Sequence, residues 1–126
     1  DLRKSINVEI KKSLKKNIIC GDFYWLAEAF INIIKNADNR PTCDKIVLSS
    51  YKNPLYTSLI IEDNGGGIEE ENMKKIFKRF YKTPDSNGFG IGLAMAKTIV
   101  EKNNGEISVS NIDAGARFEI KFYNVT

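Results

Sequence analysis

The sequence contains no histidine, and its only two cysteines, Cys20 and Cys43, lie far apart and form no Cys-x-x-Cys pair. These absences exclude a zinc site made of Cys and His, and also a cysteine nucleophile activated by histidine, because the required side chains are missing. We therefore expect both cysteines to be reduced residues of the core.

Long apolar runs are also absent. No stretch approaches the roughly 20 apolar residues of a membrane-spanning helix, and no secretory signal is present. The 126 residues are 42% hydrophobic and 28% charged, which is typical of one soluble globular domain covering residues 1–126.

The formal charge is only +3. The basic cluster at residues 11–16 is more typical of a solvated surface than of a site for an acidic partner. Because the chain starts at Asp1 rather than at a methionine, we expect it to be part of a longer protein.

Apolar periodicity predicts the secondary structure. Alternation with a period of two predicts strands at Ile6–Ile10, Ile18–Cys20, Glu106–Ser110 and Arg117–Phe122. Two further segments, Lys45–Tyr51 and Leu55–Glu62, are rich in strand-forming residues and flank the turn signal at residues 52–54, which predicts an antiparallel hairpin. A period near 3.6 predicts helices at Phe23–Asp38, at Met73–Tyr81 as the later part of a helix, and at Gly92–Asn103. We expect the last helix to end before Gly105 in a left-handed cap, and Gly115 to form the turn between the last two strands.

The predicted helix Phe23–Asp38 has two distinct faces. One carries an apolar stripe that can pack on a sheet, formed by Phe23, Leu26, Phe30, Ile33, Ile34 and Ala37. On the other side Glu28, Asn32 and Asn36 follow one another one turn apart, with Lys35 in the same arc. This row is either a solvated face or a set of amide oxygens directed at a cation such as Mg²⁺, which prefers oxygen ligands.

The stretch Glu62–Ile68, EDNGGGI, ends a predicted strand in three glycines. Glycines let the backbone approach a flat ligand closely, while Asp63 places a carboxylate at the strand end. Because a carboxylate only accepts hydrogen bonds, it selects a ligand that offers donors, such as the amino group of adenine. The alternative is a turn that caps a following helix.

Glycines recur at every second position in Asn87–Val100, NGFGIGLAMAKTIV, directly before a helical pattern. Backbone amides at a helix N-terminus favour phosphate, although alternating glycines also occur in flexible turns. The preceding segment, Thr83–Asn87, is short and polar, and we expect it to act as a mobile lid.

Four features thus follow one another: the asparagine row, Asp63 with its glycines, the aromatic pair Phe77 and Phe80, and the glycines of Asn87–Val100. Their order and spacing resemble the ATP-binding catalytic domain of sensor histidine kinases, within the GHKL group that includes gyrase, the Hsp90 chaperones and MutL. The resemblance covers nearly the whole chain. It implies a two-layer α/β sandwich of the Bergerat type, with a mixed, largely antiparallel sheet of about five strands packed against three helices.

The first half of the chain resembles two boxes of that family. In the N box, EAFINIIKNA, the resemblance implies that Asn36 holds Mg²⁺ against the triphosphate, with Asn32 and Lys35 beside it. In the G1 box, EDNGGGI, it implies that Asp63 bonds the adenine amine, and that the loop around the base is formed by Gly65, Gly67 and Ile68.

The second half resembles the other two boxes. In the F box, IFKRFYK, Phe77 and Phe80 are the anchors, Phe80 is implied to contact the nucleotide, and Arg79 is implied to direct its charge at the phosphates. In the G2 box, the nucleotide-binding residues are implied to be Gly88, Gly90, Gly92 and Leu93. The resemblance thus implies three catalytic residues, namely Asn32, Lys35 and Arg79.

The chain departs from the family pattern at several positions. Asn39 and Arg40 stand where kinases usually have a lysine and an aromatic residue, and Ala116 replaces the usual hydroxyl residue near the last glycine. In the hydrolytic relatives a glutamate one turn before the magnesium asparagine activates water. Here that position is Asn32, an amide that cannot act as a base.

The resemblance therefore implies a domain that binds MgATP and transfers the γ-phosphoryl group to a histidine of another protein domain, as part of a two-component system. The implied partners are a histidine-containing dimerisation domain of the same protein and a downstream response regulator, in a homodimeric, membrane-bound sensor kinase. We expect this domain to lie in the cytoplasm, without nucleic acid as a partner and without direct membrane contact.

Three alternatives remain open. The first is a GHKL ATPase and the second is a serine kinase of the anti-sigma type. The third is a non-catalytic nucleotide-binding module, which the departures at Asn39, Arg40 and Ala116 favour. A dinucleotide-binding fold fits poorly, because no buried strand leads directly into Gly88.

Overall fold

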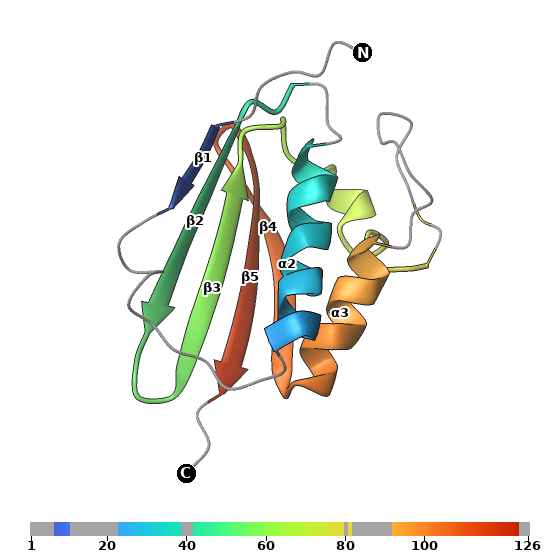
Figure 1. Ribbon diagram of the computed structural model, residues 1–126. Helices are drawn as coiled ribbons and strands as arrows, with labels where there is room; N and C mark the ends of the chain where they lie inside the picture. Colours follow the sequence, from blue (N-terminus) through green and yellow to red (C-terminus); the bar gives the residue numbers. More distant parts are fainter. Residues whose placement is uncertain (1–6, 11–22, 39–41, 80, 82–91, 124–126) are drawn as a thin grey trace.

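The computed structural model describes residues 7–10, 23–38, 42–79, 81 and 92–123. In this part of the chain, two α-helices lie side by side on one face of a five-stranded sheet (Figure 1). The elements in chain order are β1 (Asn7–Ile10), α2 (Phe23–Asp38), β2 (Lys45–Lys52), β3 (Tyr56–Asp63), the 3₁₀ turn η1 (Glu70–Asn72), α3 (Gly92–Lys102), β4 (Gly105–Ile112) and β5 (Gly115–Tyr123).

The sheet is mixed and largely antiparallel, as predicted. Its strand order is β1-β2-β3-β5-β4. β1 runs parallel to β2, with Val8 opposite Ile46, whereas β2, β3, β5 and β4 pair antiparallel. β2 and β3 form the hairpin expected around residues 52–54. Because β3 is the central strand, its last residue lies between β2 and the β4–β5 turn.

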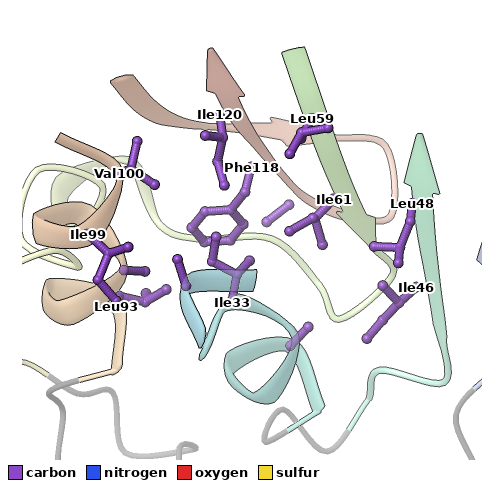
Figure 2. Close-up of a cluster of buried hydrophobic side chains, with 14 of the residues drawn as sticks. Ile33, Ile46, Leu48, Leu59, Ile61, Leu93, Ile99, Val100, Phe118 and Ile120 are labelled. Carbon is purple, nitrogen blue, oxygen red and sulfur yellow. The ribbon is translucent and has the colours of Figure 1, made fainter. Parts of the chain in front are cut away.

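The core lies between the sheet and the two helices. Side chains from both layers meet there, and Figure 2 labels Ile33, Ile46, Leu48, Leu59, Ile61, Leu93, Ile99, Val100, Phe118 and Ile120. Alternate residues of β5 point inward, so Phe118 and Ile120 are buried while Glu119 between them is not. Full burial of such a side chain contributes about 1.5–3 kcal/mol, so these layers hold α2 and α3 firmly against the sheet.

The predicted apolar stripe of α2 is confirmed from Leu26 to Ala37, whereas the side chain of Phe23 lies outside the described part. Ile33 and Ala37 are buried, and the residues that pack partly against the core are Leu26, Phe30 and Ile34. The helix spans Phe23–Asp38, as expected. Cys43 is a free, buried thiol, also as expected. Ile18–Cys20, predicted as a strand, lies outside the described residues.

The predicted helix at Met73–Tyr81 is wrong. In the described residues this region contains the short turn η1, followed by hydrogen bonds that mostly span three residues, such as Lys78 N to Lys75 O at 2.9 Å. Ile76 is buried and its neighbour Phe77 also packs on the core. An amphipathic α-helix buries residues that are three or four positions apart. Two adjacent residues that both pack on the core therefore favour irregular turns.

The left-handed cap expected before Gly105 is confirmed, whereas the prediction for Gly115 needs correction. The left-handed residue after α3 is Asn104, with φ of 62°, and Gly105 already begins β4. Gly115 is the first residue of β5, so the turn between the last strands consists of residues 113–114. Within the described residues, neither α-helix is long and apolar enough to cross a membrane.

Candidate nucleotide site

Asp63 is the last residue of β3 and, among the described residues, the one charged side chain that is buried, with 4% of its surface exposed. Its Oδ1 accepts hydrogen bonds from the backbone N–H of Gly65 at 2.9 Å and of Ala116 at 3.3 Å. Two backbone donors therefore fix the orientation of the carboxylate and offset the cost of its burial. The sequence predicted a carboxylate at this strand end but not the role of Ala116.

The G1 loop, residues 64–68, adopts a conformation that requires glycine. Gly66 and Gly67 have φ of 95° and 77°, which other residues rarely adopt. The backbone N–H of Gly66 donates to Ala114 O at 3.0 Å, and Thr42 Oγ1 donates to Gly65 O at 3.0 Å. These two bonds hold the loop beside Asp63, and glycine backbone of this kind permits the close approach of a flat ligand.

Gly115 approaches Asp63 so closely that no side chain fits between them. A methyl group at position 115 would overlap the backbone oxygen of Asp63 and would lie 2.7 Å from Oδ1 of the same residue. This contact explains the glycine better than the turn that we predicted. The start of β5 and the end of β3 therefore form one unit around the carboxylate.

Two asparagines that the sequence analysis did not single out hold the G1 loop from either side. Asn64 Oδ1 accepts from the backbone N–H of Asp44 at 2.9 Å and of Lys45 at 3.0 Å, and its amide nitrogen donates to the Asp44 carboxylate. Asn111, at the end of β4, bonds the backbone of Ile68. The role of Asn64 could have been predicted from its position within EDNGGG. The role of Asn111 could not, because it depends on Ile68, which lies 43 positions away in the sequence.

The asparagine row of the N box lies on α2, outside the apolar stripe that packs on the sheet. Asn32 and Asn36 are half-buried, while Glu28 and Lys35 are exposed. Within the described part of the chain, Nδ2 of Asn32 is buried and has no hydrogen-bond partner. A buried donor of this kind is costly unless a ligand or water satisfies it. The row predicted from the sequence is thus present, and one of its amides lacks a partner.

The start of α3 meets the asparagine row. A methyl group built at Gly92 would lie 3.8 Å from Cβ of Asn32, so the two helices come into close contact there. Leu93, the next residue, is buried in the core. The fold therefore brings the first turn of α3 beside the N box. The other G2 glycines, Gly88 and Gly90, and the predicted lid at Thr83–Asn87 lie outside the described residues.

Of the F-box residues that the structure describes, Phe77 packs on the core and Arg79 is an exposed cation. The ring of Phe77 packs edge-on against Phe118, with centroids 6.2 Å apart, and Lys97 Nζ lies 5.9 Å from the Phe77 centroid. Such an arrangement is favourable for both the aromatic pair and the cation. Arg79 is exposed, and Phe80 lies outside the described residues.

The donor set suits an adenine nucleotide with a hard metal ion. Asp63 offers an oriented acceptor, the G1 loop offers close backbone, and Asn32 offers a buried donor. Among the described residues, no group of three or more His, Cys, Asp or Glu side chains could hold a metal. An ion here would therefore take amide and phosphate oxygens, which is the ligand type that Mg²⁺ accepts.

Comparison with known proteins identifies relatives of this chain. The chain is 32% identical over 119 residues to sporulation kinase C of Bacillus subtilis, covering 90% of this chain and 28% of that protein. It is 40% identical over 96 residues to the sensor protein kinase WalK of Staphylococcus aureus, covering 70% of this chain and 23% of that protein. The chain thus spans about a quarter of the length of these relatives.

Solved structures have the same fold. The ATP binding domain of PrrB from Mycobacterium tuberculosis superposes with a TM-score of 0.80 at 25% identity, covering 96% of this chain and 82% of that one. The mycobacterial sensor histidine kinase MprB gives a TM-score of 0.78 at 25% identity, covering 96% and 84%. Residues 21–125 match the family described as "Histidine kinase-, DNA gyrase B-, and HSP90-like ATPase". This chain therefore belongs to the family of histidine kinase-, DNA gyrase B- and HSP90-like ATPases.

Proposed function

We propose that this chain is the catalytic domain of a sensor histidine kinase, which binds MgATP and donates the γ-phosphoryl group to a histidine on another domain. Family membership and the kinase relatives support this assignment. The observation that carries it is Asn32. In a hydrolase of the family this position, one turn before Asn36, requires a base, and an amide cannot take a proton from water.

The nearest carboxylate in the same row of α2 lies too far from Asn36 to replace that base. Glu28 lies a further turn from Asn36 and is exposed. The site therefore favours positioning of ATP over activation of water. Phosphoryl transfer depends mainly on positioning and on stabilisation of phosphate charge, so a site without its own base can still serve a nucleophile that another domain supplies.

Each residue of the site has a proposed task. Asp63 accepts a hydrogen bond from the adenine amine, and the loop around the base consists of Gly65, Gly67 and Ile68. Asn36 contributes an amide oxygen to Mg²⁺, and Nδ2 of Asn32 donates to the bound nucleotide or its water. Mg²⁺, when bound, would offset negative charge on the phosphates.

The remaining tasks concern the phosphates. The exposed cations Lys35 and Arg79 lie on the surface, where they can approach the phosphates when the acceptor domain docks. Phe80, Gly88 and Gly90 are proposed to complete the site, together with Gly92 at the start of α3. The buried Leu93 supports Gly92 from the core.

The acceptor must lie outside this sequence, because the chain contains no histidine. We propose that it belongs to a dimerisation domain of the same protein, a homodimeric membrane-bound sensor, and that the phosphoryl group passes from there to a response regulator. The matched region is 28% and 23% of the length of the two kinase relatives, which leaves room for such domains.

Radiolabelled ATP tests this function directly. We expect the isolated chain to remain unlabelled, and a histidine-containing dimerisation domain from a related sensor kinase to acquire an acid-labile, base-stable phosphoryl group when mixed with it. A matched acceptor with its histidine replaced by glutamine should stay unlabelled. Steady hydrolysis of ATP without transfer would instead support a GHKL ATPase, and an acid-stable label on serine would support the anti-sigma type of kinase.

A further inference from the structure

Asn111 lies where the inward-facing row of β4 ends. Ile107 and Val109 pack against the core, and strand side chains alternate, so Asn111 continues the same row beyond the apolar region. It is exposed and stands two residues before the β4–β5 turn. A polar side chain at this place has no core to fill, and its contacts are with the G1 loop.

The Asn111 amide makes two hydrogen bonds to a single residue of that loop. Its Oδ1 accepts from the backbone N–H of Ile68 at 2.8 Å, and its Nδ2 donates to the backbone carbonyl of Ile68 at 2.7 Å. The side chain thus binds Ile68 as a neighbouring strand would, although residues 64–69 belong to no helix or strand.

The contact also restricts the residue before Ile68. A methyl group at Gly67 would lie only 2.9 Å from Oδ1 of Asn111, at a backbone φ of 77° that already disfavours other residues. Together with the hydrogen bond from Gly66 N to Ala114 O, the amide docks the second half of the loop onto the β4–β5 turn. Directly after this turn, the start of β5 supplies the Ala116 N–H that orients Asp63.

We propose that Asn111 is a positioning residue for the base of the nucleotide, which acts by holding Ile68 at a fixed distance from Asp63. This inference rests on the proposed function, in which Ile68 and Asp63 contact adenine. Asn111 itself touches neither the base nor the phosphates in this account. Its effect must therefore pass through Ile68 and be the same for every adenine nucleotide.

The test is a double-mutant cycle measured by calorimetry with a non-hydrolysable ATP analogue and with ADP. We expect Asn111→Ala to weaken both ligands by the same factor, about tenfold, which corresponds to about 1.4 kcal/mol. In an Ile68→Ala background the same substitution should have little further effect, because the side chain that it positions is already gone. Ser110→Ala is the matched control, since Ser110 is exposed on the opposite face of β4, and it should bind like the parent.

Thermal unfolding of the nucleotide-free proteins separates positioning from a purely structural role. Because both hydrogen bonds are exposed to solvent, we expect Asn111→Ala to unfold near the parent's midpoint. Asn111→Ser, which keeps a polar group at this exposed position, serves as the second variant if Asn111→Ala does not fold.

Several outcomes would overturn the proposal. Parent-like affinity in Asn111→Ala would refute it, as would an equal loss in the parent and Ile68→Ala backgrounds, or a large fall in the midpoint. These outcomes would leave the proposed function intact, provided that the parent protein binds the analogue. A parent protein that bound no nucleotide would refute the proposed function itself, and this inference with it.

Discussion

Replacing Asp63 by asparagine should lower the nucleotide affinity strongly and leave the fold nearly intact. The Oδ1 atom already accepts two backbone hydrogen bonds, from Gly65 and Ala116, in a buried environment. The amide of the Asp63→Asn variant has almost the same shape, and its oxygen can keep both of these donors satisfied. Its nitrogen then takes the place of the second carboxylate oxygen.

The size of the effect follows from this exchange. The nitrogen is a donor, and it would meet the adenine amino group, which is also a donor. A hydrogen bond to a charged group contributes about 1.5–3 kcal/mol, so its loss should lower the affinity roughly 10- to 150-fold. The negative charge disappears as well, which acts in the same direction.

Asp63→Ala provides the contrast. It leaves the N–H groups of Gly65 and Ala116 without their buried acceptor, and each unsatisfied buried donor costs about 1–3 kcal/mol. We therefore expect the free energy of unfolding to fall by about 2–6 kcal/mol, a large part of the typical stability of about 5–15 kcal/mol. Loss of binding in this variant would consequently be hard to separate from loss of structure.

Calorimetry with a non-hydrolysable ATP analogue and Mg²⁺ measures the affinity, and urea unfolding of the nucleotide-free protein measures the stability. Glu62→Gln is the matched control, because the Glu62 carboxylate lies one residue away and pairs with Arg117 at 3.6 Å on the outer face of the sheet. It should bind like the parent. Parent-like affinity in Asp63→Asn would refute the adenine role, and a fall in stability that accounts for the lost affinity would assign Asp63 a structural role alone.

Two further substitutions test the metal and the close approach at the strand end. Asn36→Ala should abolish the part of the binding that depends on Mg²⁺, because an amide oxygen is lost, and an equal effect of Mg²⁺ on parent and variant in calorimetry would contradict this. Gly115→Ala should lower both the affinity and the stability, the latter by about 1–3 kcal/mol, because its methyl group would displace Asp63. Gly105→Ala is the control: its methyl group would lie 2.9 Å from Lys121 O, so urea unfolding should detect a loss of stability without a loss of affinity. Equal affinity losses in the two glycine variants would show that the effect is not specific to the Asp63 contact.

Sequence periodicity predicted most of the architecture because each element carries its own pattern. The 3.6-residue period in α2 defines both its apolar stripe and its asparagine row, and alternation in β5 defines which residues face the core. The prediction of a helix at residues 73–81 was wrong for a physical reason. The adjacent residues Ile76 and Phe77 both pack on the core, and the shape of the core that selects them cannot be read from a local sequence pattern.

The glycines also differ in whether a local pattern or the tertiary structure explains them. Gly66 and Gly67 could be predicted as loop residues from their cluster, and their positive φ agrees with that prediction. Gly115, by contrast, was predicted as a turn residue, whereas it is required by the backbone of Asp63, which lies 52 positions earlier in the chain. The left-handed cap expected before Gly105 is formed by Asn104. Asparagine tolerates that conformation better than most residues, so it can form the cap in place of a glycine.

The sequence by itself determined the residue types of the site and their order along the chain: amides one turn apart on a helix, a carboxylate at a strand end, and glycines beside it. These are local properties, set by helical and strand periods and by the conformational freedom of glycine. The tertiary structure alone decided which of these groups meet. The Asn111 amide reaches Ile68 across 43 positions, and the Ala116 N–H orients Asp63 across 53, because β5 pairs with β3 and carries the β4–β5 turn to the end of that strand.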